Sequence, residues 1–208
     1  MTQSPSPSSR IVVFDLGKVL LDFDYGKLSR AVAKISTAGG EAIRKLIDHS
    51  PLLFRYETGL IDREYFFHEV RQATGFRGTL AEFVPLFSDI FEPIPEMIEL
   101  HAKLRQQRVP VYIFSNTNDM AIEHIRRAYP FFSQFDGYIY SFEQGAMKPD
   151  PRIYTALENL TGRTGTDIVY LDDRAENVAG GTARGWVGIH HVSNEGTMAA
   201  LREQGFKI

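Results

Sequence analysis

Cysteine is absent from the 208 residues of this chain, which excludes disulfides, thiol nucleophiles and cysteine-ligated zinc. Long apolar runs are also missing, because no segment approaches the roughly 20 apolar residues that a membrane helix needs. Charge of one sign does not accumulate either, since 23 Lys and Arg against 26 Asp and Glu give a formal net charge of −3. We therefore expect a soluble cytoplasmic protein that binds small molecules, and neither nucleic acid nor a membrane.

Composition divides the chain into three parts. Residues 1–9 are rich in Ser and Pro, without the basic start and apolar segment of a signal peptide, and we expect a disordered tail. Residues 25–92 show helical periodicity, whereas residues 10–24 and 93–208 combine strand and helix patterns. This organisation predicts one core domain that is interrupted by a helical insertion.

The insertion is expected to contain four or five helices. Apolar residues recur at helical spacing from Asp22 to about Glu92, and no convincing strand occurs there. Turn signals such as Gly39-Gly40, Ser50-Pro51 and Gly59 separate the helices. An aromatic group is predicted to form the core of the insertion: Phe54, Tyr56, Phe66, Phe67, Phe83, Phe87 and Phe91.

Strands and helices alternate in the rest of the chain. A buried strand is expected over residues 11–14, and four more are expected over residues 109–114, 138–140, 168–171 and 186–190. Helical patterns precede or separate these strands after Pro93. Strands that alternate with helices imply parallel βαβ units, and we therefore predict an α/β fold with a doubly wound parallel sheet.

Chemically versatile side chains follow the predicted strands. Ligands of doubly wound sheets bind outside the carboxyl ends of the strands, where the strand order reverses. Four polar features occupy such positions: Asp15, Ser115-Asn116, Lys148 and Asp172-Asp173. Each alone also has a structural explanation, as a helix cap, a turn residue or a solvated charge. Together they predict a pocket with a carboxylate nucleophile, an anion site, a cation and a metal site.

In this order the motifs resemble those of the haloacid dehalogenase superfamily of hydrolases, most of which are phosphatases. Asp15 matches the nucleophilic aspartate of that family, and Lys148 matches the lysine of its third motif. The strand end Phe114-Ser115-Asn116 matches its phosphate-binding motif, and Leu171-Asp172-Asp173 with Asn177 matches its acidic motif. The resemblance implies a Rossmann-like core and identifies the insertion with the family's helical cap of the first type.

Four further runs are similar to a subgroup that includes bacterial α-D-glucose-1-phosphate phosphatases. The runs are Phe14-Asp15-Leu16-Gly17, Asp22-Phe23-Asp24, Tyr56-Glu57-Thr58-Gly59 and Ser115-Asn116-Thr117-Asn118. This similarity implies a small phosphorylated metabolite as the substrate, with a sugar phosphate as one candidate.

The resemblance also implies roles for the residues of the site. Asp15 would attack a phosphate monoester and form an aspartyl-phosphate. Mg²⁺ would bind to Asp15, to the backbone carbonyl of Gly17 and to Asp173, supported by the neighbouring Asp172 and Asn177. Lys148 would offset the charge of the phosphate and keep Asp15 ionised. The Ser115 hydroxyl and the Asn116 backbone N–H would bind phosphate at the start of a helix.

Gly17 departs from the family pattern. Phosphatases of the superfamily usually have there a second aspartate, which protonates the leaving group. Its absence leaves two alternatives open: a hydrolase of the dehalogenase or phosphonatase type, or a phosphate-binding protein without turnover. The neighbouring Lys18 either lies near the bound anion or points to solvent, and we expect the second.

Overall fold

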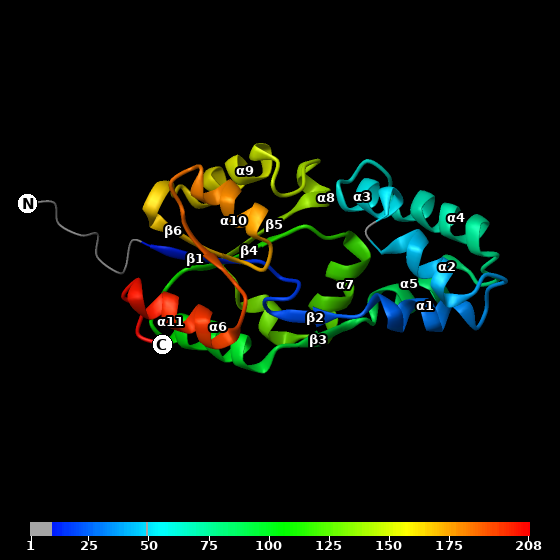
Figure 1. Cartoon of the computed structure of the whole chain (residues 1–208), viewed down its shortest axis with the longest axis horizontal. Coiled ribbons are helices and arrows are strands. Elements are labelled where there is room, and N and C mark those ends of the chain that lie inside the picture. The colour runs from blue at the N-terminus through cyan, green and yellow to red at the C-terminus, as the bar shows by residue number, and fades with distance from the viewer. Residues whose placement is uncertain (1–9, 49) are drawn as a thin grey trace, which may run out of the picture.

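The structure is a computed structural model that describes residues 10–48 and 50–208. The tail predicted for residues 1–9 lies outside the described residues. An α/β core occupies one end of the molecule, and a group of helices occupies the other end (Figure 1). Within the described ranges, no helix combines the length and the apolar character that are needed to cross a bilayer.

Five parallel strands form the central sheet in the order β5-β4-β1-β6-β7. Their bounds are Ile11–Phe14 (β1), Val111–Ser115 (β4), Gly137–Tyr140 (β5), Ile168–Asp172 (β6) and Val187–His190 (β7). The chain adds strands first on one side of β1 and then on the other side. This order confirms the predicted doubly wound sheet and places the reversal of strand order beside β1.

Helices cover both faces of the sheet (Figure 1). Ile11 and Val13 of β1 pack in a cluster with Tyr154, whereas Val12 and Phe14 point to the opposite face. The helices of the core are α6 (Pro95–Gln106), α7 (Asp119–Ala128), α8 (Ser141–Gln144), α9 (Pro151–Thr161), α10 (Ala175–Thr182) and α11 (Asn194–Glu203), with 3-10 turns at Pro130–Gln134 and Gly165–Asp167. Because β1 is buried on both faces, its sequence is apolar throughout.

A two-stranded antiparallel hairpin links the core to the insertion. Strand β2 (Leu21–Phe23) leads out of the core, and strand β3 (Phe91–Pro93) leads back and pairs with it. The expectation that no strand occurs between Asp22 and Glu92 is therefore wrong. Each strand has only three residues and its partner is remote in the sequence, so no local periodicity marks the pair.

Five helices, which we call the cap, form the insertion within the described residues. They are α1 (Tyr25–Ala33), α2 (Gly40–Ile47), α3 (Pro51–Glu57), α4 (Arg63–Thr74) and α5 (Leu80–Ser88). Most of the predicted aromatic core is buried in one apolar cluster. Phe54 is an exception, because 54% of its surface is exposed, and Phe91 is only partly buried. The prediction of a core position was therefore wrong for Phe54.

Helix α7 of the core anchors the cap. Met120 of α7 is buried in the apolar cluster of the cap, and its carbonyl accepts a hydrogen bond of 3.1 Å from the Ser88 hydroxyl. Asp119 accepts a hydrogen bond from the Tyr56 hydroxyl and another, of 2.6 Å, from Arg63 Nε. These contacts join α3, α4 and α5 to the first turn of α7, which begins just beyond the end of β4.

Arg108 offers a test of the backbone between α6 and β4. It is exposed and adopts a left-handed conformation with φ of 60°, which is costly for a residue with a Cβ atom. Arg108→Gly should raise the free energy of unfolding by about 0.5–1 kcal/mol, measured by urea denaturation. Gln106→Gly in the last turn of α6 is the matched control and should lower it, and equal effects of the two changes would contradict the argument.

Candidate active site

The ends of three adjacent strands meet at a cavity of about 790 Å³. Asp15 follows β1, Ser115 ends β4, and Asp173 follows β6. Since β1 pairs with both β4 and β6, their carboxyl ends lie together. The predicted site residues that line the cavity are Asp15, Gly17, Ser115, Asn116, Lys148, Asp173 and Asn177. Asp172 lies directly behind them and is fully buried.

Lys148 holds two carboxylates together. Its ammonium nitrogen lies 3.0 Å from Asp15 Oδ1 and 2.6 Å from Asp172 Oδ2, and it donates a hydrogen bond of 2.7 Å to the carbonyl of Phe114. An ammonium group has three protons, so these three oxygens satisfy it. Only 1% of the side chain is exposed, and the alternative explanation of Lys148 as a solvated charge is wrong.

The side chain of Asn116 positions Lys148. Its Oδ1 accepts a hydrogen bond of 2.8 Å from the Lys148 N–H, and its Nδ2 donates one of 3.0 Å to the Lys148 carbonyl. Both polar groups of this amide are therefore engaged by the same backbone segment. The sequence had marked Asn116 for its backbone N–H alone, because no local pattern connects it with a residue so far along the chain.

The phosphate-binding segment does not begin a helix. Helix α7 starts at Asp119, and Asn118 is its N-cap, with a side chain that accepts a hydrogen bond of 3.0 Å from the Ala121 N–H. The expectation that Ser115 and Asn116 stand at a helix start is therefore wrong by about one turn. Asn is among the best N-cap residues, and its capping bond sets the start of α7. The Thr117 N–H donates to the hydroxyl of Ser141, at 2.9 Å, which anchors the intervening segment.

Asp172 is saturated with hydrogen-bond donors. Besides Lys148, it accepts hydrogen bonds from the Arg174 N–H at 2.9 Å, from Asn177 Nδ2 at 3.0 Å and from the Tyr170 hydroxyl. Burial alone would raise the pKa of Asp172, but Lys148 and these donors together lower it. Asp172 is thus an ionised group that orients Lys148 and has little capacity left for a ligand.

Asp15, Asp172 and Asp173 form a cluster that fits a divalent cation. One oxygen from each lies within 4.8 Å of the others. Burial raises the pKa of Asp15 to about 7, although Lys148 opposes this shift, and burial together with Asp172 raises the pKa of Asp173. Three carboxylates around one ammonium leave an excess of negative charge, which a hard cation with oxygen ligands would relieve. Asp15 and Asp173 border the cavity and are the two available to such an ion.

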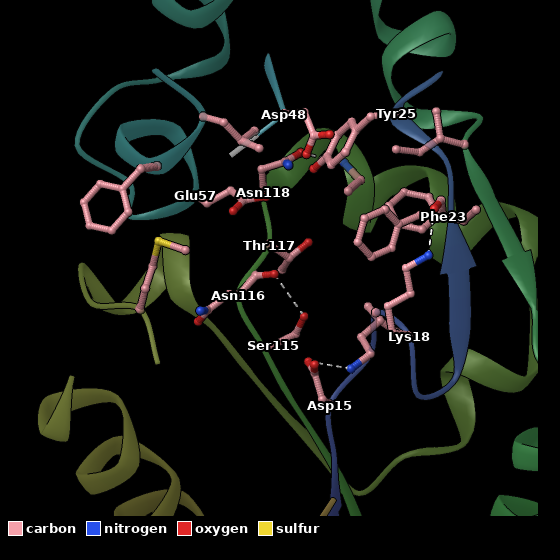
Figure 2. A pocket seen from close by; sticks show the side chains of 18 of the residues that line it. Asp15, Lys18, Phe23, Tyr25, Asp48, Glu57, Ser115, Asn116, Thr117 and Asn118 are labelled. Atoms are coloured by element: carbon pink, nitrogen blue, oxygen red, sulfur yellow. Dashed lines mark hydrogen bonds between the residues drawn. The ribbon is translucent and has the colours of Figure 1, made fainter. Parts of the chain in front are cut away.

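Lys18 does not face Asp15. Its ammonium pairs with Asp22 and donates a hydrogen bond of 3.1 Å to the carbonyl of Phe23, so that it lies along the hairpin (Figure 2). Its side chain is 44% exposed. Lys18 is thus partly exposed, as expected for a side chain that points to solvent, but it also lines the cavity.

The cap supplies the other end of the cavity. Here the side chains of Glu57 and Asn118 lie near each other (Figure 2), and burial raises the pKa of Glu57 to about 7 although Asn118 opposes this shift. The cavity lining contributed by the hairpin and the cap is otherwise mixed, with apolar residues Phe23, Leu53, Phe54, Phe87, Ile90 and Phe91 and polar residues Asp24, Tyr25, Arg44, Asp48 and Ser50. Glu57 appeared in the sequence only within a subgroup pattern, because nothing local indicates that it faces a cavity.

A family model described as haloacid dehalogenase-like hydrolase matches residues 10–185. The chain is 25% identical over 195 residues to the sesquiterpene phosphatase astK of Aspergillus oryzae. The aligned residues make up 93% of this chain and 95% of the relative. It is 22% identical over 174 residues to the D-ribitol-5-phosphate phosphatase of Bacteroides thetaiotaomicron, covering 80% of this chain and 84% of the relative. A haloacid dehalogenase family enzyme of the same bacterium, solved with magnesium and inorganic phosphate, shares the fold with a TM-score of 0.75. Its sequence is 23% identical, and the match covers 85% of this chain and 91% of the solved chain.

Glu57 generates a prediction for the pH dependence of stability. Because its pKa in the folded protein lies above the ordinary value of 4.5, the folded state binds more protons, and its contribution to stability is lost as pH rises towards 7. Part of Glu57 remains accessible through the cavity, so solvent weakens the effect on stability. Glu57→Gln should raise the free energy of unfolding by about 1–2 kcal/mol near pH 8 and by much less near pH 5.

The measurement is urea denaturation at both pH values. Glu64→Gln on the exposed side of α4 is the control and should change stability little at either pH. If Glu57→Gln changed the free energy of unfolding equally at both pH values, the carboxyl of Glu57 would not be a buried group that ionises with difficulty.

Proposed function

Since the chain belongs to the haloacid dehalogenase-like hydrolases, we propose that it is a magnesium-dependent phosphatase that hydrolyses a small phosphate monoester through an aspartyl-phosphate. The observation that carries this proposal is the buried ammonium of Lys148 between Asp15 and Asp172, with Asp173 on the same cavity. Two relatives named as phosphatases, each matched over most of its length, support it.

The proposed reaction begins with attack by a carboxylate oxygen of Asp15 on the phosphorus atom. The bond between phosphorus and the ester oxygen breaks, and the leaving group departs with the electron pair. Water then attacks the phosphorus, the bond to Asp15 breaks, and inorganic phosphate is released. Lys148 favours the ionised form of Asp15 against the effect of burial and balances the charge of the phosphoryl oxygens. The Ser115 hydroxyl, whose contact with the Asn116 carbonyl is long at 3.3 Å, is available to a phosphoryl oxygen.

Mg²⁺ would be held by Asp15, the backbone carbonyl of Gly17 and Asp173, while Asp172 and Asn177 support these ligands from behind. The donor set consists of oxygens, which Mg²⁺ prefers. When bound, the ion would reduce the repulsion between the Asp15 carboxylate and the phosphate group. The solved relative that contains magnesium and inorganic phosphate supports this assignment.

The size and lining of the cavity bear on the substrate. A volume of about 790 Å³ far exceeds a phosphate group, so an organic leaving group fills the rest. Glu57 and Asn118 can bind a hydroxyl there, and the rings of the hairpin and cap can contact an apolar surface. We therefore propose an organic monophosphate with both kinds of surface. A sugar phosphate joined through its anomeric oxygen is the leading candidate, because that hydroxyl is more acidic than other sugar hydroxyls.

Asp15→Asn tests covalent catalysis. The amide cannot form the acyl-phosphate, so phosphate release in the presence of Mg²⁺ should fall below about 1% of wild type. The fold should persist, because Lys148 still pairs with Asp172. Phosphate release and thermal melting should therefore separate. Glu99→Gln on the exposed face of α6 makes the same chemical change away from the cavity and should keep the activity. Substantial activity in Asp15→Asn would contradict the proposal.

The absence of a carboxyl at Gly17 predicts a steep dependence on the leaving group. General-acid help is worth about 10²–10⁴-fold, so esters of poorly leaving alcohols should suffer most. Aryl phosphates should react fastest, anomeric sugar phosphates should be intermediate, and simple alkyl phosphates should be slowest. The measurement is a plot of log kcat/KM against the pKa of the leaving group. A nearly flat plot would mean that another residue supplies the proton.

A further inference from the structure

Gly17 is not required by the turn in which it lies. Its φ is outside the left-handed region that favours glycine, unlike that of the next residue, Lys18. A Cβ atom at position 17 would instead lie 2.9 Å from Cε1 of Phe23, which is closer than carbon atoms approach without a shift. A side chain at position 17 would therefore meet the aromatic ring of Phe23 and not the backbone, and the ring would have to shift.

The ring of Phe23 is held on several sides. Tyr25 and Phe91 contact it edge to face, with centroid distances of 5.5 and 6.2 Å. The ammonium of Lys18 lies 4.6 Å from the ring centroid, and its pairing with Asp22 keeps it there. Figure 2 shows Phe23 and Lys18 side by side at the wall of the cavity, with Asp15 below them. A shift of the ring would therefore disturb these contacts.

The place that the ring takes is next to the reacting group. Gly17 and Phe23 both line the cavity with Asp15, and position 17 is about 7 Å along the chain from the nucleophile. In the family pattern a carboxyl side chain at this position protonates the leaving group, so a carboxyl group there is expected to reach the ester oxygen. The leaving group meets an aromatic C–H surface at this point instead of a proton donor.

Two other carboxyl groups of the cavity, those of Asp24 and Glu57, are placed differently from such a donor. Asp24 caps α1 through the Gly26 N–H and pairs with Arg30, and these bonds lower its pKa, so that it is ionised at neutral pH. Glu57 lies in α3 of the cap and interacts with Asn118, three residues along the chain from Ser115. The broken bond therefore leaves its electron pair on the ester oxygen, which takes a proton from water after departure.

On the basis of the proposed function, we propose that Phe23 determines the leaving-group specificity of this enzyme. Its ring occupies the space of a general acid and selects phosphate esters whose leaving group departs as a stable anion and offers an apolar or C–H face. The substrate class is thus that of aryl, enol or anomeric phosphates, and not phosphates of simple alcohols.

The test compares Gly17→Asp in two backgrounds. In the wild-type background the new carboxyl meets the ring, and kcat/KM for an alkyl phosphate should change less than about threefold. In the Phe23→Val background the same change should raise it by about 10²-fold, with less gain for 4-nitrophenyl phosphate. Gly17→Asp with Tyr65→Val is the matched control, because Tyr65 is an exposed ring of α4 that is not among the residues that line the cavity, and it should show no gain. Equal gains with and without the Phe23 ring would overturn the proposal.

A second measurement does not depend on activity. Gly17→Ala should lower the melting temperature in the wild-type background and raise it in the Phe23→Val background, because only the first contains the clash. A change of melting temperature with the same sign in both backgrounds would overturn the steric premise. This measurement remains decisive even when the Gly17→Asp variants do not fold. Failure of the proposed function itself would appear separately, as phosphate release in wild type that Asp15→Asn does not remove.

Discussion

The buried contact of Lys148 with Asp15 and Asp172 is the interaction on which the site depends. It joins the carboxyl ends of β1 and β6 to the Phe114 carbonyl of β4 through one ammonium. An ion group of this kind is costly to bury, and removal of one partner would leave an unpaired charge in the interior. The donors around Asp172 reduce that cost, since they satisfy its oxygens without water. The polar network is thus complete at Asp172 and open at Asp15, where chemistry is needed.

The segment from Ser115 to Asn118 connects the two ends of the cavity. Its first residue lies at the proposed phosphate end, and its last residue both caps α7 and interacts with Glu57 of the cap. The next two residues, Asp119 and Met120, hold α3, α4 and α5 of the cap. A displacement of the cap would therefore be transmitted to the phosphate end of the cavity through only a few residues. This short path offers a physical link between recognition of the leaving group and the position of the reacting group.

Much of this arrangement follows from the sequence, but not all of it. The apolar runs of β1 and β6 are long enough to mark buried parallel strands, and polar residues at their ends converge because adjacent strands are parallel. Other contacts join residues that are distant in the sequence. Examples are the pairing of β2 with β3, the hydrogen bonds between Asn116 and Lys148, and the position of Glu57 beside Asn118 in the cavity. None of these contacts has a local signature. Phe54 shows the same limit, since an aromatic residue at helical spacing can line a cavity as well as a core.

Gly17 illustrates how structure changes the meaning of a sequence departure. From the sequence alone, a glycine in place of an acid is the loss of a catalytic group. In the structure the space beside it is filled by Phe23, whose ring is fixed by Tyr25, Phe91 and Lys18. A filled space implies that the acid cannot be restored by one substitution, because the neighbouring ring must change with it. The glycine and the ring therefore act together. In the proposed function they restrict the range of leaving groups and provide an apolar contact surface beside the reacting bond.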